Sequence, residues 1–223
     1  MWGKIGDWLV DFVYPKDCVG CGKSGEWLCG KCRVEFEEVE QICPVCGRKS
    51  AGGYVHKKCS KKLGMDGLTV VYEYDERVMK SFIFKVKFEF NKEMLEELVS
   101  LLDFSMGKKF DVVVPVPLSI YRRNWRGFNQ NRVIADEVGR QLGVPVVEVL
   151  KRVGGAKQQL KIKNRKGKIR DVKGMFEAGE VKGKAILLVD DVFSGGATMR
   201  EVSKVLKKAG ASFVWGLVLV MKT

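Results

Sequence analysis

Two adjacent acids and a glycine-containing loop form the segment of the chain best suited to bind a ligand. Asp190 and Asp191 follow the apolar run at residues 185–189, and the next small residues are Ser194, Gly195, Gly196, Ala197 and Thr198. Backbone N–H groups and hydroxyls at the start of a helix favour one phosphate group. Adjacent carboxylates repel a phosphate but accept hydrogen bonds from sugar hydroxyls. The segment therefore predicts a ribose 5-phosphate site; the alternative is an acid pair that only caps a helix.

All seven cysteines and the single histidine of the chain lie within residues 18–59. They form four pairs with two residues between the members: Cys18 and Cys21, Cys29 and Cys32, Cys43 and Cys46, His56 and Cys59. Such pairs reach one zinc ion from a tight turn, and eight ligands complete two tetrahedral sites. Disulfides explain the pattern less well because the number of cysteines is odd. We expect two structural zinc ions, with sequential pairing of the motifs favoured and a cross-brace of the first with the third as the alternative.

A second polar segment combines arginines with aromatic residues. The stretch VPVPLSIYRRNWRGFNQ, residues 114–130, contains Arg122, Arg123 and Arg126. Guanidinium groups bind diphosphate oxygens through paired hydrogen bonds. We therefore expect these arginines to lie on a loop after a strand and to contact a pyrophosphate group, whereas an exposed basic loop without a ligand is the alternative.

The hydrophobic pattern predicts the elements that position these residues. Strands are expected at residues 68–74, 111–114, 144–150, 185–189 and 213–220. Helices are expected at residues 91–102, 129–142 and 199–209, the second capped by Asn129 and closed by Gly143. The segment SFIFKVKFEF, residues 81–90, suits either a strand or the end of a helix. Strands separated by helices indicate an α/β fold with a parallel sheet and helices on both faces.

Composition limits the classes of protein to consider. The chain has 223 residues, of which 46% are hydrophobic, enough for one substantial core and a small second module. Its formal net charge of +13 favours a polyanionic partner, either nucleic acid or a phosphorylated ligand. No apolar run approaches the roughly 20 residues that span a bilayer, so we expect a cytoplasmic protein without membrane insertion. We place an N-terminal helix and a double zinc-binding module at residues 1–64 and the α/β domain at residues 65–223.

Two segments resemble known families. VDDVFSGGAT resembles the phosphoribosyl pyrophosphate (PRPP) signature of type I phosphoribosyltransferases, and VPVPLSIYRRNWRGFNQ resembles the hallmark of the ComF family. ComF proteins are bacterial proteins of late competence and DNA uptake that join a double zinc ribbon to a phosphoribosyltransferase domain. The resemblance implies that Asp190 and Asp191 hold the ribose hydroxyls and residues 194–198 the 5-phosphate. It also implies Mg2+ bound with PRPP, and pyrophosphate as the leaving group.

The resemblance is weakest at residues 151–176. There the family usually has Gln, Arg and Asn before Gly-x-Phe, and this chain has Gln159, Lys168 or Arg170, and Asp171. We expect this segment to form a hood over the ligand. Two functions stay open: a transferase that moves the phosphoribosyl group of PRPP to an unidentified acceptor, and a DNA-uptake accessory that binds single-stranded DNA and other DNA-uptake proteins and uses the PRPP site as a sensor. Interleaved aromatic and basic residues in YRRNWRGF favour the accessory, as do Lys57, Lys58, Lys61 and Lys62.

Overall fold

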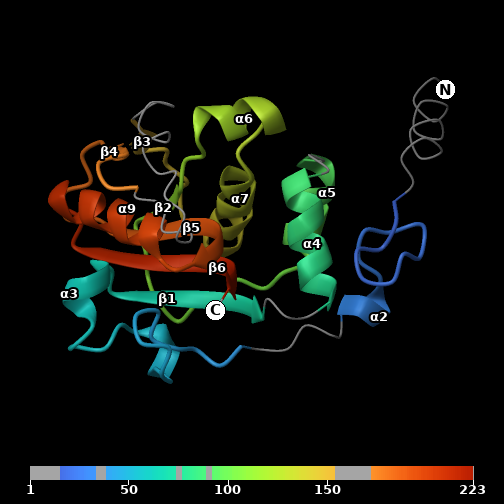
Figure 1. The fold of residues 1–223 in the computed structure, drawn as a ribbon, viewed down its shortest axis with the longest axis horizontal. Helices are drawn as coiled ribbons and strands as arrows, with labels where there is room; N and C mark the ends of the chain where they lie inside the picture. The colour runs from blue at the N-terminus through green and yellow to red at the C-terminus, as the bar shows by residue number, and fades with distance from the viewer. Residues whose placement is uncertain (1–15, 34–38, 74–76, 89–91, 154–171, 223) are drawn as a thin grey trace, which may run out of the picture.

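A parallel four-stranded sheet forms the centre of the molecule (Figure 1). The computed structural model describes residues 16–33, 39–73, 77–88, 92–153 and 172–222. The strand order is β1-β6-β5-β2, and every pairing within this sheet is parallel. These strands are β1 (Gly67–Glu73), β2 (Val112–Pro115), β5 (Ala185–Ser194) and β6 (Phe213–Lys222). The predicted α/β fold class with a parallel sheet is therefore confirmed.

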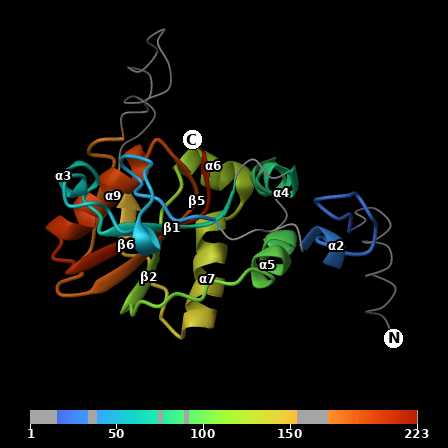
Figure 2. The same ribbon diagram turned by 90° about the horizontal axis from the view of Figure 1, so that it is seen from below.

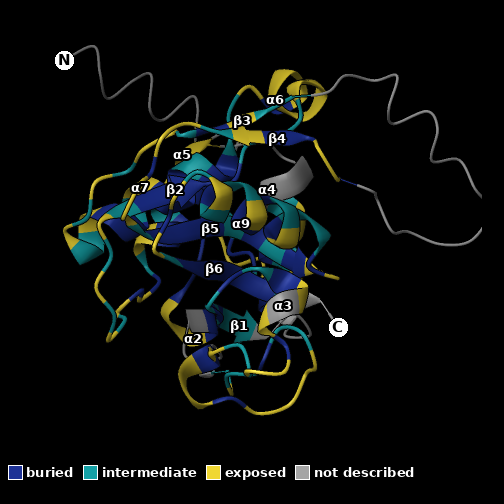
Figure 3. Cartoon of the chain, turned by 90° about the vertical axis from the view of Figure 1, so that its left-hand side faces the viewer, coloured by how far each residue is buried: buried dark blue, intermediate teal, exposed yellow. Residues whose placement is uncertain are grey.

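Helices cover both faces of this sheet. One face carries α4 (Arg77–Phe88), α5 (Lys92–Ser100) and α7 (Gln130–Leu142), and the other carries α3 (Ser60–Leu63) and α9 (Ala197–Lys208). Figure 2 shows these two groups on opposite sides of the strands. Along β5 the side chains alternate, so Leu187 packs with α7 while Leu188 packs with α9. Because both faces are covered, β5 and β6 are mostly buried and apolar (Figure 3).

Several predicted elements are confirmed. The ambiguous segment at residues 81–90 is helical up to Phe88, and the next residues lie outside the described structure. Asn129 caps α7 by accepting a hydrogen bond from the backbone N–H of Asn131 at 3.1 Å. Gly143 ends the same helix in the left-handed region, at φ 67°, as its position in the sequence predicts.

The strand predicted at residues 144–150 is wrong. Val146 makes one isolated parallel bridge to Val113, and a short strand, β3 (Leu150–Arg152), begins only at the end of this run. Pro145 has no N–H to donate, so the segment follows the edge of β2 through only a few backbone bonds. β3 pairs instead with β4 (Phe176–Ala178) in an antiparallel hairpin. Most of the expected hood connects these two strands and lies outside the described residues, including Gln159, Lys168, Arg170 and Asp171.

The arginine segment is a short helix rather than the expected loop. This helix, α6 (Ile120–Arg126), begins after Ser119, whose hydroxyl accepts a hydrogen bond from the backbone N–H of Arg122. It ends at Gly127, which adopts φ 75°. A cap at each end explains why seven residues without an extended apolar stripe form a helix.

The cysteine-containing segment packs on the α/β unit at two separate places (Figure 1). Around α2 (Gly30–Arg33), Val19 and Leu28 share a core with Phe82 of α4. Around the 3-10 turn η1 (Ala51–Gly53), the chain follows β1 instead. The predicted N-terminal helix falls within residues 1–15, outside the described structure, and the proposed boundary at residue 64 stays a prediction. None of the described helices is long and apolar enough to cross a membrane.

Candidate functional site

Asp190 and Asp191 lie where the sheet opens between two strands. β2 ends at Pro115, opposite Val189, whereas β5 continues alongside β6 as far as Ser194. The two acids therefore lie within β5, not beyond its end as the sequence predicts. The helix α7, which follows β2, covers one face, and α9, which follows β5, covers the other. Open α/β sheets bind ligands at the carboxyl ends of strands where such a reversal occurs, so this position is the candidate site.

Two amide side chains at the start of α7 contact the acids. Gln130 donates from Nε2 to Oδ2 of Asp191 at 3.2 Å. Asn131 donates from Nδ2 to Oδ1 of Asp190 at 2.8 Å and to the carbonyl of Val116 at 2.9 Å. Both amides and Asp191 are buried, and Asp190 is partly exposed. The acids are thus fixed from one side and Asp190 still reaches solvent.

The predicted loop at residues 194–198 is shorter in the structure. Ser194 ends β5 and Ala197 begins α9, so only Gly195 and Gly196 connect the two elements. Gly195 and Gly196 both adopt φ 68°, a left-handed conformation that favours glycine. A Cβ on Gly196 would lie 2.6 Å from Cζ of Phe193, whereas a Cβ on Gly195 would meet nothing within 4 Å. The aromatic ring of Phe193 therefore packs closely against the loop at Gly196. The space beside Gly195 is open and could hold a ligand.

The structure separates the three arginines of α6. Arg122 and Arg123 are exposed, whereas Arg126 is 7% exposed, and its Nε and Nη1 have no hydrogen-bond partner among the described residues. Burial lowers the pKa of Arg126, and the nearby Asp191 carboxylate opposes this effect. Arg126 thus lies close enough to Asp191 for their charges to interact, while the other two arginines are available on the surface.

The predicted zinc ligands form two groups of four in sequential order. One group contains Cys18, Cys21, Cys29 and Cys32, and the other contains Cys43, Cys46, His56 and Cys59. Within each group the ligand atoms lie within 4.8 Å of one another. Two sulfurs bound to one zinc ion at about 2.3 Å should lie about 3.8 Å apart in a tetrahedron. The Sγ atoms of Cys21 and Cys29 are 3.6 Å apart, so the geometry fits zinc and excludes the cross-brace.

Electrostatics at the two clusters also suits a divalent cation. Burial raises the pKa of the Cys18 thiol, but hydrogen bonds led by the backbone N–H of Cys29 outweigh it and bring the value to about 6. Hydrogen bonds led by the backbone N–H of Arg48 lower the pKa of Cys46 to about 6. Burial raises the pKa of Cys32, and the neighbouring thiols raise it further. Four adjacent thiolates repel one another unless a cation such as zinc neutralises them.

Comparisons with known proteins agree with this organisation. The model of the double zinc ribbon domain matches residues 9–60, and that of the phosphoribosyl transferase domain matches residues 130–222. Competence protein ComFC of Bacillus subtilis is 29% identical over 203 residues, which cover 84% of this chain and 81% of the relative. The chain is therefore similar to a ComF-type competence protein over most of its length. It thus combines a double zinc ribbon with a phosphoribosyltransferase domain.

Two further relatives extend the ComF comparison. Competence protein F of Haemophilus influenzae is 26% identical, with 90% of this chain and 89% of the relative covered. DNA utilization protein YhgH of Escherichia coli is 28% identical, with 85% of this chain and 88% of the relative covered. Similarity to these relatives therefore covers most of the chain.

Sequence reasoning missed Gln130 and Asn131 as residues of the site. Gln130 is the last residue of the ComF-like stretch and Asn131 follows it, so both were visible only as the polar start of a helix. A signal was nevertheless present, because α7 packs on the sheet and polar residues on its inner face need partners. The nearest acids after a buried strand are Asp190 and Asp191, which supply those partners.

Proposed function

We propose that the chain binds PRPP together with Mg2+ and transfers its phosphoribosyl group to an acceptor, with release of pyrophosphate. The observation that carries the proposal is the position of Asp190 and Asp191 at the opening between β2 and β5, beside a loop with two left-handed glycines. The matched phosphoribosyl transferase model covers both the acids and the loop. A cytoplasmic location is part of this proposal.

Each polar group has one role in the proposed reaction. The carboxylates of Asp190 and Asp191 accept hydrogen bonds from the ribose hydroxyls, and the backbone from Ser194 to Thr198 holds the 5-phosphate at the start of α9. Arg122 and Arg123 approach the pyrophosphate from the exposed side of α6. Mg2+, which prefers oxygen ligands, neutralises charge on the diphosphate when bound. Catalysis then depends on positioning and charge stabilisation as the bond between C1 and the pyrophosphate oxygen breaks.

The double variant Asp190→Asn, Asp191→Asn tests the proposal. We expect calorimetry with PRPP and Mg2+ to show no binding, because neutral amides replace both acceptors without changing side-chain size. Asp103→Asn is the matched control, since Asp103 is exposed and lies between α5 and β2. Thermal unfolding of both variants verifies that they fold. Unchanged affinity for PRPP in the folded double variant would refute the assignment of the PRPP site to these two acids.

Binding of single-stranded DNA is a second candidate, favoured by the surface of α6. Tyr121 is 78% exposed and Trp125 is 52% exposed, and Arg122 and Arg123 lie between them in the sequence. Aromatic rings stack on bases while basic groups contact phosphates, and such binding weakens with salt. Partner proteins of DNA uptake belong to the same proposal, which is suggested by the names of the competence relatives.

A fluorescence titration with labelled single-stranded DNA tests this second function. Trp125→Ala should weaken binding by about 1 to 3 kcal/mol if a base stacks on the indole. Saturating PRPP with Mg2+ should compete, because Arg122 and Arg123 serve both ligands in the proposal. DNA binding that ignores PRPP would locate the DNA site elsewhere, with the exposed Lys57, Lys58 and Lys62 as the next candidates.

A further inference from the structure

The two aspartates present a geometric problem that their own strand solves only in part. Successive side chains of a strand point to opposite faces of the sheet, so Asp190 and Asp191 diverge unless other groups hold them. Their like charges also favour separation. Both carboxylates must nevertheless face one ligand if they bind neighbouring hydroxyls of one sugar. Within β5 the backbone N–H of Asp191 donates to Oδ1 of Asp190 at 3.1 Å. The Asp191 carboxylate depends on groups outside the strand.

The start of α7 supplies these groups. Gln130 donates to Asp191 at 3.2 Å, and Asn131 donates to Asp190 at 2.8 Å. The two amides are 2% and 1% exposed, so their side chains have little freedom to leave the acids. Asn131 also donates to the carbonyl of Val116 at 2.9 Å. One side chain thus joins α7, the turn after β2 and the middle of β5.

Buried polar atoms around the acids lack partners among the described residues. They are Oε1 of Gln130, Oδ1 of Asn131, and Nε and Nη1 of Arg126. A buried polar atom without a partner destabilises the fold, so a network that only stabilises the fold is normally complete. This incomplete network, next to acids at the opening of the sheet, indicates a ligand-binding role for the cluster.

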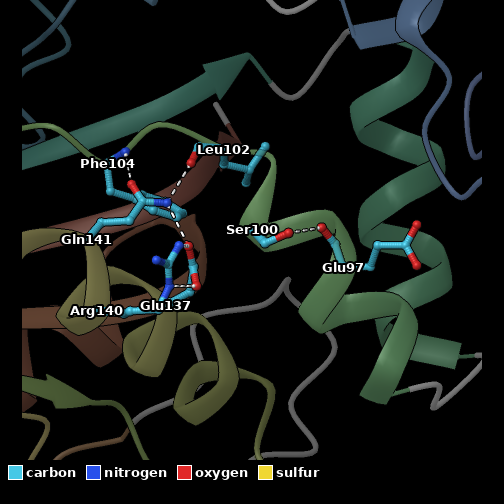
Figure 4. Close-up of polar contacts among 7 residues, drawn as sticks. All are labelled: Glu97, Ser100, Leu102, Phe104, Glu137, Arg140 and Gln141. Carbon is cyan, nitrogen blue, oxygen red and sulfur yellow. Dashed lines mark hydrogen bonds and ion pairs between the residues drawn. The ribbon is translucent and has the colours of Figure 1, made fainter.

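Gln141 at the other end of α7 shows what a structural amide looks like (Figure 4). Its Oε1 accepts a hydrogen bond from the backbone N–H of Phe104 at 3.1 Å. Its Nε2 donates to the carbonyl of Leu102 at 2.9 Å and to Glu137 at 2.8 Å. All its partners belong to the protein, and both ends of the amide are used. Gln130 and Gln141 are therefore the same residue type on the same helix, but only Gln141 has hydrogen-bond partners at both ends of its amide among the described residues.

We propose that Gln130 and Asn131 are positioning residues that hold Asp191 and Asp190 for the ribose of the ligand. The inference rests on the proposed function, because it assigns the acids to sugar hydroxyls. Removal of the Gln130 amide frees the Asp191 carboxylate to rotate and removes one hydrogen bond to a charged group. Since such a bond contributes about 1.5 to 3 kcal/mol, affinity for a ribose-containing ligand should fall at least about tenfold.

Gln130→Met and Gln141→Met form a matched pair for the test. Both remove an amide while keeping a long side chain on the same helix. Calorimetry measures PRPP with Mg2+, and pyrophosphate with Mg2+ serves as a probe without ribose. We expect Gln130→Met to bind PRPP about tenfold more weakly and pyrophosphate as the wild type does. Gln141→Met should unfold at a lower temperature and bind both probes normally.

The outcomes separate the inference from the proposed function. Wild-type protein that does not bind PRPP would refute the proposed function and the inference with it. Wild-type binding combined with unchanged PRPP affinity in folded Gln130→Met would refute the inference alone. Equal losses for PRPP and pyrophosphate would also refute it, because they indicate a general disturbance of the site. Should Gln130→Met not fold, Gln130→Asn keeps a polar amide but withdraws it from Asp191 by one methylene, and the same results are expected.

Discussion

A methyl group at Gly196 should disturb the loop before α9 far more than the same methyl group at Gly195. Both glycines adopt φ 68°, so alanine at either position costs about 1 to 2 kcal/mol in backbone strain. At Gly195 the added Cβ meets nothing within 4 Å. At Gly196 it would lie 2.6 Å from Cζ of Phe193, whose ring is buried. Overpacking of this kind costs a further 1 to 3 kcal/mol or so, which gives about 2 to 5 kcal/mol for Gly196→Ala.

Urea unfolding of the two variants and the wild type measures this difference. We expect a lower midpoint for Gly196→Ala than for Gly195→Ala, with similar slopes, because only the native state is affected. In a Phe193→Leu background the two alanine variants should approach each other, since the ring that causes the clash is gone. Equal free energies of unfolding for Gly195→Ala and Gly196→Ala would refute the reasoning, as would a larger loss at Gly195.

Three other predictions follow from contacts elsewhere. Lys108→Ala should lower the free energy of unfolding by about 1 to 2 kcal/mol, because Nζ of Lys108 lies 4.1 Å from the Trp215 ring centroid. Lys109→Ala removes an exposed lysine and should change this free energy little in the same denaturation assay. Elemental analysis should find two zinc ions per chain, and one ion or none would contradict the assignment. Chelation should lower the thermal unfolding temperature, because the first cluster shares a core with α4. Leu63→Ala and Leu98→Ala should each cost about 2 to 5 kcal/mol, but only Leu63→Ala should also weaken PRPP binding measured by calorimetry.

Local signals in the sequence were sufficient for the sheet and the metal clusters. The apolar run before Asp190 predicts a central strand, and the pair spacing predicts the ligands of both zinc sites. These predictions succeed because burial on both faces leaves a continuous apolar pattern, and because zinc geometry requires nearby donors. Neither depends on how distant segments pack.

Properties that depend on tertiary contacts were not predictable in the same way. Nothing local distinguishes Arg126 from Arg122, because both lie on one face of α6. Arg126 is nevertheless buried near Asp191, whereas Arg122 is exposed. The failure at residues 144–150 has a related cause, because Val146 has β-strand character but Pro145 limits the hydrogen bonds that its segment can make with β2. The length of β5 beyond Val189 is set by its partner β6, not by its own residues.

The position of the second zinc cluster relative to the loop before α9 gives the metal a connection to the candidate site. Cys59 is both a ligand and the residue before α3, a helix of four residues. A helix this short is not stable by itself, so its ends must fix it. At the far end Leu63 is 1% exposed, and its Cδ1 lies 3.5 Å from the Cβ position of Gly196. Zinc bound at Cys59 would order one turn of helix whose last side chain packs against the loop that we propose for the 5-phosphate. This contact gives a physical reason for a zinc ribbon to precede this sheet.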